Sequence, residues 1–277
     1  MGFVDTYLGF VDMWECDENQ HMNVRFYWSK FEAADRQFRR IAGLDGRLPH
    51  RLTRHVRYHA ELAGGMPVGI RSARIESAPG TIAIVHEMRP LGSEAISATA
   101  LDRYLVDRPD DLGPAAVPMP ASAVPRGLDI APAALDLSTE AAIEAGGAMT
   151  AMTRVTVAEA DVDGVIEDYV HIARASDAAP HAWARLGMTR AWLAERGLGR
   201  VAVEMKLTYG ERLRAGDLVH LVSTVGPVSR RTLVQTHRYF ESRSGRPAAV
   251  CEVVALAMDM ATRRAVTIPA EILERYG

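Results

Sequence analysis

The most regular hydrophobic pattern in the chain lies between residues 24 and 44. Apolar side chains recur there every three or four positions, at Tyr27, Phe31, Ala34, Phe38 and Ile41. This spacing places them on one face of an α-helix. Asn23 is a favourable N-cap residue, and Gly43 follows the last apolar positions as a typical stop. The pattern therefore predicts an amphipathic helix that begins after Asn23 and ends near Gly43.

Shorter stretches around this helix show the partial alternation of strands. One precedes the helix at residues 7–13, and four follow it at residues 51–62, 68–77, 81–89 and 94–106. Gly and Pro pairs at 64–67 and 79–80 mark turns between them. One long helix followed by consecutive antiparallel strands predicts an α+β fold built in layers.

The pattern breaks between residues 107 and 149, where prolines interrupt every regular stretch. A short helix at 139–145 is the exception that we predict there. Beyond it, strand patterns return at 201–209, 218–225, 233–242 and 248–260. These changes divide the chain into a first unit at 1–108, a Pro/Ala-rich linker at 109–150 and a second unit at 151–277.

The second unit resembles the first in its order of elements. A shift of 144 positions places Glu15 on Glu159, Asp17 on Asp161 and Gly43 on Gly187. A shift of 151 positions places Tyr58 on Tyr209, Leu62 on Leu213 and Gly65 on Gly216. We interpret this as a tandem repeat with an insertion in the loop after the helix. Because Pro180 falls inside the second helix pattern, we expect that helix to start there or to be kinked.

Composition excludes several classes of function. The formal net charge of the 277 residues is −3, so the chain lacks the excess of basic residues that is typical of nucleic-acid-binding proteins. No apolar run reaches the roughly 20 residues of a membrane span, and the first residues lack the basic region of a signal peptide. Cys16 and Cys251 are too few for a disulfide framework. We therefore expect a cytoplasmic protein without membrane or nucleic-acid partners.

The densest group of reactive side chains comes directly before the long helix, at Asp17, Asn19, His21 and Asn23. A carboxylate and an imidazole can carry out acid–base catalysis, and a helix N-terminus offers free N–H groups to a developing negative charge. Cys16 is a less suitable nucleophile, because the neighbouring carboxylates of Glu15 and Asp17 raise the pKa of a thiol.

This segment resembles the signature of hotdog-fold thioesterases. The matching elements are Asp17-x-Asn19-x-His21-Met22-Asn23 and the helix residues Tyr27, Phe31 and Glu32. They are similar both to the 4-hydroxybenzoyl-CoA thioesterase-like group and to the Asp-x-Asn-x-His element of acyl-ACP thioesterases. Val24 departs from the pattern, since that family often has a second Asn there. The resemblance implies a double hotdog, with two antiparallel sheets each wrapped around a long helix. It also allows a homodimer of such double-hotdog chains.

The resemblance also implies roles for individual residues in hydrolysis of an acyl-CoA or acyl-ACP thioester. Asp17 would be the general base or the nucleophile, and His21 would orient it or protonate the leaving thiolate. Asn19 and Asn23 would hold the loop or donate to the substrate carbonyl. Trp14, Tyr27 and Trp28 would line an acyl slot. Glu32 is a second candidate acid.

A second stretch, His55-x-Arg57-Tyr58-x-x-Glu61-Leu62, is similar to hotdog strands that line the thioester cleft, so Glu61 is a further candidate contact to substrate. His55 and His59 lie too far apart along a strand to chelate readily, and we expect neither a metal nor a cofactor. Two alternatives stay open: a hydratase of enoyl thioesters, whose Asp-x-Asn-Pro-x-His element is one residue longer, and a non-catalytic binding protein for acyl thioesters.

Overall fold

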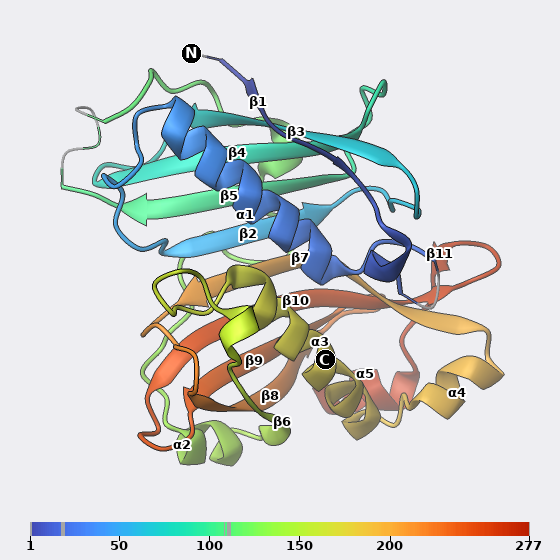
Figure 1. Cartoon of the computed structure of the whole chain (residues 1–277). Helices are drawn as coiled ribbons and strands as arrows, with labels where there is room; N and C mark the ends of the chain where they lie inside the picture. Colours follow the sequence, from blue (N-terminus) through green and yellow to red (C-terminus); the bar gives the residue numbers. More distant parts are fainter. Residues whose placement is uncertain (1, 18–19, 108, 110–111, 277) are drawn as a thin grey trace. The chain divides into compact units, whose positions relative to one another are not determined.

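Figure 1 shows the computed structural model of the chain, which describes residues 2–17, 20–107, 109 and 112–276. The chain divides between Pro132 and Ala133 into two compact units. The segment predicted as a linker, residues 109–150, is therefore shared between the two units. Its part before Pro132 packs on the first unit, where Arg74 donates hydrogen bonds to the carbonyl groups of Leu112 and Pro114 at 2.6 and 3.0 Å.

The first unit consists of one long helix and an antiparallel sheet. The helix α1 spans Val24–Ile41. The strands are β1 at Val4–Phe10, β2 at Thr53–Tyr58, β3 at Pro67–Ile75, β4 at Thr81–Pro90 and β5 at Ala98–Leu105. Within the unit they lie in the order β1-β3-β4-β5-β2, and α1 crosses the face of this sheet (Figure 1).

Most predicted elements of this unit are confirmed, with two corrections at their ends. The first strand begins at Val4 instead of Tyr7, and Met13–Glu15 forms a 3₁₀ turn. Ile41 was expected on the buried face of the helix, but it is 49% exposed. The reason is the turn after the helix, where Gly43 has a φ of +66° and the fully buried Leu44 enters the core instead.

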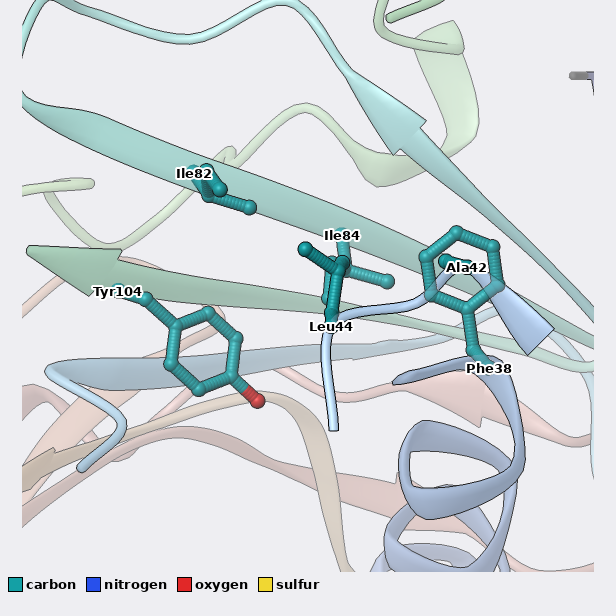
Figure 2. Close-up of a cluster of buried hydrophobic side chains, with 6 residues drawn as sticks. All are labelled: Phe38, Ala42, Leu44, Ile82, Ile84 and Tyr104. Carbon is teal, nitrogen blue, oxygen red and sulfur yellow. The ribbon is translucent and has the colours of Figure 1, made fainter. Parts of the chain in front are cut away.

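The core of the unit lies between α1 and the sheet. Tyr27, Trp28, Phe31 and Phe38 are buried on the face of the helix that was predicted to be apolar. Figure 2 shows the cluster at the C-terminal end of the helix, which contains Phe38, Ala42, Leu44, Ile82, Ile84 and Tyr104. This packing fixes α1 on the sheet and so positions the segment that precedes the helix.

The second unit contains the same elements with additional short helices. Its strands are β6 at Ala148–Arg154, β7 at Leu198–Tyr209, β8 at Leu218–Val228, β9 at Leu233–Glu241, β10 at Pro247–Asp259 and β11 at Arg264–Ala265. Its helices are α2 at Thr139–Glu144, α3 at Asp168–Arg185, α4 at Arg190–Glu195 and α5 at Ala270–Tyr276. Within the unit the main strands follow the order β7-β10-β9-β8-β6, and β11 pairs with β10.

The repeat predicted from sequence is present in the structure. β6 and α3 begin and end 144 positions after β1 and α1. The expectation that the second helix starts at Pro180 is wrong, because α3 runs through that proline. A proline removes one backbone hydrogen bond of a helix, but Ala178, Ala182 and Trp183 are buried around it and hold α3 by tertiary packing. Strand β6 was not predicted, since its Ala, Met and Thr residues lack clear apolar alternation.

Each unit also contains a buried Ser–His pair at equivalent positions. In the first unit, Ser72 Oγ lies 2.6 Å from His86 Nδ1. In the second, Ser223 Oγ lies 2.7 Å from His237 Nδ1. Both imidazoles are fully buried. Neither Nε2 atom has a hydrogen-bond partner among the described residues. His86 Nε2 nevertheless lies 3.4 Å from the Asp102 carboxylate, whereas Val253 stands at the equivalent position of the second unit.

This difference predicts an acid-sensitive stability of the second unit. Burial lowers the pKa of His237 from 6.5 to about 4. The unfolded chain therefore takes up the proton first, so stability is highest above pH 6.5 and falls as the pH approaches 4. Between pH 7 and 4.5 the loss is about 2–3 kcal/mol. We expect urea unfolding at the two pH values to show this loss, and the His237→Asn variant to lack it. An equal loss in the variant would contradict the assignment.

Candidate active site

The segment before α1 is a closed loop held by backbone hydrogen bonds. Asp17 N–H donates to His21 O at 2.9 Å, and Cys16 and Met22 form a bridge across the base of the loop. Met22 N–H donates to Leu62 O at 2.8 Å, and Asn23 N–H donates to Glu15 O at 2.9 Å. The loop is thus tied both to the 3₁₀ turn before it and to the chain that follows β2. Asn19 lies outside the described residues.

Asn23 is the N-cap of α1, as predicted. Its side-chain oxygen accepts a hydrogen bond from Arg25 N–H at 3.2 Å. The cap satisfies one of the free N–H groups of the first helical turn. The others keep the partial positive charge that a helix N-terminus presents. The polar loop therefore lies directly against an electropositive helix end.

Removing this cap should destabilise the first unit. We expect Asn23→Ala to lower the free energy of unfolding by about 1 kcal/mol, because the N–H of Arg25 loses its partner. Asn23→Asp is the matched control, since aspartate caps equally well, and it should leave stability nearly unchanged. Urea unfolding of both variants tests this, and equal stabilities would show that the cap contributes nothing.

Four of the predicted site residues, Asp17, His21, Tyr27 and Glu61, lie at the loop. Asp17 Oδ1 lies 3.4 Å from His21 N, and His21 Nδ1 lies 3.5 Å from Glu61 Oε2. The Tyr27 hydroxyl accepts a hydrogen bond from Leu62 N–H at 3.2 Å. Burial raises the pKa of Tyr27, and the negative charges of Glu61 and Asp17 raise it further. The Asp17 carboxylate thus contacts the backbone of His21, the His21 imidazole contacts the Glu61 carboxylate, and the Tyr27 hydroxyl contacts the backbone of Leu62. These four side chains lie around one partly exposed loop, which we call the loop cluster.

Cys16 lies beside this cluster but is a poor nucleophile. Burial raises the pKa of its thiol, and the carboxylates of Asp17 and Glu15 add to the effect. The thiol donates to the carbonyl oxygen of Asp12 at 3.5 Å. This agrees with the expectation from sequence that the thiolate is disfavoured.

The predicted aromatic residues occupy different environments. Tyr27 contacts Tyr58 edge to face, with ring centroids 5.2 Å apart. Trp28 is fully buried, and its indole N–H donates to the Tyr58 hydroxyl at 3.0 Å. Trp14 is 76% exposed on the 3₁₀ turn. Tyr27 is the aromatic side chain that touches the loop cluster, while Trp28 packs in the core behind it.

Glu32 belongs to a second polar network that sequence reasoning did not find. Its carboxylate lies 3.1 Å from both Arg36 and Arg51 and 3.2 Å from Arg54. Arg51 also binds Asp35 at 2.7 Å, and both Asp102 oxygens bind Arg54 at 2.6 and 2.7 Å. Such saturation by guanidinium groups is typical of a structural ion-pair network.

The buried side chains of Asp35, His86 and Asp102 in this network are of the types that bind metals. Arg51 and Arg54, however, occupy the oxygens of both carboxylates at 2.6–3.0 Å. A divalent cation would have to displace two cations from a site without exposed surface. The donor set therefore fits ion pairing and does not fit a metal.

A surface groove of about 920 Å³ lies at the opposite end of α1. It is lined by residues that include Gly46, Leu48 and Leu105. An 18-residue helix is about 27 Å long, so this groove is remote from the Asp17 loop. We assign it no part in the chemistry.

Comparison with known proteins agrees with a hotdog fold. Residues 155–276 match the model of the thioesterase-like superfamily. No curated protein matches the sequence significantly. Among the described residues, none of the helices has the length and apolarity needed to cross a membrane.

Three solved structures share the fold over nearly the whole chain. An acyl-ACP thioesterase from Bacteroides thetaiotaomicron superposes with a TM-score of 0.62 and 7% identity, covering 91% of this chain and 97% of that one. A putative oleoyl thioesterase from Lactobacillus plantarum gives 0.62 and 9%, with coverages of 90% and 94%. The 12:0-ACP thioesterase from Umbellularia californica gives 0.64 and 11%, with coverages of 92% and 94%. The double-hotdog, α+β architecture expected from sequence is therefore confirmed.

Proposed function

Since the chain is a tandem hotdog protein with a thioesterase-like superfamily match in its second half, we propose that it hydrolyses an acyl-CoA or acyl-ACP thioester at the Asp17 loop of the first unit. The observation that carries the proposal is the cluster of Asp17, His21, Glu61 and Tyr27 against the N-terminus of α1. In the second unit, Val165 and Glu167 occupy the positions of His21 and Asn23. The equivalent loop there lacks the imidazole and the amide.

Each residue has a role in this mechanism. The thioester carbonyl points at the N–H groups of the first turn of α1, which stabilise the negative charge that develops on its oxygen. Asp17 removes a proton from a water molecule that attacks the carbonyl carbon, or attacks that carbon itself. The C–S bond then breaks, and the sulfur leaves as a thiolate. Where Asp17 is the nucleophile, the acyl group is then bound to Asp17 as an anhydride, and a water molecule hydrolyses this anhydride to release the acid.

His21 completes the reaction by protonating the leaving thiolate, so that the products are a free acid and a free thiol. The Glu61 carboxylate lies 3.5 Å from His21 Nδ1 and orients the imidazole for this step. Tyr27 stays neutral because its pKa is raised, so it can donate a hydrogen bond to the loop or to the substrate. Trp14 is proposed to border the acyl group, and Asn19 to contact the substrate. Trp28 and Glu32 lie in the core and in the ion-pair network, so we propose that they support α1 behind the site.

The proposal is tested by thiol release from a panel of acyl-CoA and acyl-ACP thioesters of different chain length and polarity. We expect thiol and free acid to appear in equal amounts with at least one substrate. Enoyl-CoA in the same panel detects hydration, by loss of the enoyl absorbance without thiol release. No thiol release from any member, or hydration without thiol release, would contradict the proposal.

A further inference from the structure

One buried ion pair lies beneath the loop and takes no part in the mechanism above. Lys30, on α1, places its Nζ 2.8 Å from both carboxylate oxygens of Glu15. The side chains of Lys30 and Glu15 are only 6% and 12% exposed. The ammonium group also lies 5.8 Å from the ring centroid of Tyr7 on β1. The pair therefore joins the helix to the segment that leads into the Asp17 loop.

Glu15 holds both ends of that loop. Its Oε2 accepts a hydrogen bond from Asp12 N–H at 3.1 Å, which fixes the 3₁₀ turn before the loop. Its backbone oxygen accepts one from Asn23 N–H at 2.9 Å, where the loop enters α1. Asp17 is two residues after Glu15. Any shift of Glu15 therefore moves Asp17 relative to the helix N-terminus.

The second unit repeats this arrangement with a different cation. Arg174 Nη2 lies 2.5 Å from Glu159 Oε1, and Thr156 N–H donates to Glu159 Oε2 at 2.9 Å. Glu167 N–H donates to Glu159 O at 3.0 Å, as Asn23 does to Glu15. This Arg174–Glu159 pair thus lies beside a loop that is closed by the equivalent backbone hydrogen bond, from Asp161 N–H to Val165 O at 2.8 Å, and that has no histidine. The Arg174–Glu159 pair is therefore an internal control for the Lys30–Glu15 pair of the first unit.

We propose that Lys30 is a positioning residue for the Asp17 loop, acting through Glu15; the catalytic part of this inference rests on the function proposed above. Without Lys30, the buried Glu15 carboxylate has lost its counter-ion, so its free energy is lower when it moves towards water. Asp17 then moves with it. The expected consequence is a less ordered loop with Asp17 displaced from its place by the helix end.

The first test measures loop order directly and needs no substrate. Amide hydrogen exchange is followed at Asp17, Met22 and Asn23, whose N–H groups are hydrogen-bonded in the loop. Lys30→Met should speed their exchange at least about tenfold, and Glu15→Gln, a milder change, should act in the same direction. Arg174→Met should leave these amides unchanged. Unchanged loop exchange in both first-unit variants would overturn the proposal, whether or not a substrate is known.

The second test separates positioning from a general loss of stability. With the best thioester substrate, Lys30→Met should lower kcat about 10- to 100-fold with little change in KM, since misplacement of a reacting group acts on the chemical step. Lys30→Arg should restore most of the activity, because arginine serves in the second unit. Arg174→Met should keep wild-type kcat. A kcat in Lys30→Met no lower than in Arg174→Met would refute the role of Lys30, while an inactive wild type would refute the proposed function instead.

Discussion

Replacing Asp17 by Asn is expected to lower kcat for thioester hydrolysis by about 100- to 10,000-fold, the contribution of a general base or nucleophile. The amide has nearly the same shape but can neither accept the proton of water nor attack the thioester. Its oxygen can still accept the hydrogen bond that Asp17 Oδ1 receives from His21 N–H at 3.4 Å. The loop should therefore keep its structure while its chemistry is lost.

This result needs evidence that the variant is folded. The melting temperature of Asp17→Asn should agree with that of the wild type within a few degrees, because the side chain is only partly buried at the surface of the loop. A folded variant with unchanged kcat would remove Asp17 from the mechanism and leave Glu61, the other carboxylate of the loop cluster, as the candidate base.

The second large effect concerns the buried ion-pair network. Arg54→Met alone and Asp102→Val alone should each lower the free energy of unfolding by about 3–5 kcal/mol, because each takes from a fully buried charge its closest counter-ion. The double variant should recover most of this loss. Urea unfolding of the wild type, both single variants and the double variant measures the coupling directly.

The second unit itself supplies the design of the double variant. Arg54 pairs with Asp102 between β2 and β5, and 151 positions later Met205 pairs with Val253 between β7 and β10. Equivalent paired positions of the two sheets are thus occupied by an ion pair in the first unit and by two apolar residues in the second. A double variant as unstable as the single variants would contradict this prediction. It would show that the neighbouring arginines and carboxylates need the Arg54–Asp102 pair and that an apolar pair cannot replace it.

The network should also affect stability in acid. Burial opposes ionisation of Asp102, but Arg51 and Arg54 outweigh it and hold the pKa of Asp102 well below its ordinary value of 3.8. The ionised carboxylate therefore stabilises the fold above pH 3.8, and this contribution is lost as the pH falls below that value. The double variant lacks this group, so its stability should change less below pH 3.8.

The sequence predicts the fold well where local signals and packing agree. Tyr27, Phe31 and Phe38 lie at helical spacing and Asn23 caps the helix, so the bounds of α1 follow from the pattern. The tandem repeat could be found because single residues such as Gly43 and Gly187 keep their left-handed turns after each helix. The predicted start of the second helix at Pro180 was wrong, because α3 begins at Asp168 and buried neighbours hold it by tertiary packing on both sides of the proline.

The site could be predicted only in part, for a related physical reason. Asp17, His21 and Asn23 stand close together in the sequence, and Glu61 lies in a stretch that resembles a cleft-lining strand. The ion-pair network joins Asp35, Arg54 and Asp102 across long sequence separations, and charged residues at such positions ordinarily suggest exposed surface. One signal was available: Asp35 lies between the apolar positions Phe31 and Phe38, on the buried side of the helix.

The most direct test of the central claim compares two matched variants in one thiol-release assay. Asp17 and Asp161 occupy equivalent positions, and each donates its N–H to the carbonyl four residues later, at 2.9 and 2.8 Å. Only the first of the two loops also carries a histidine and an N-cap asparagine. If the first unit performs the chemistry, Asp17→Asn loses nearly all kcat/KM and Asp161→Asn keeps it. Equal activities, or loss in Asp161→Asn alone, would contradict the account.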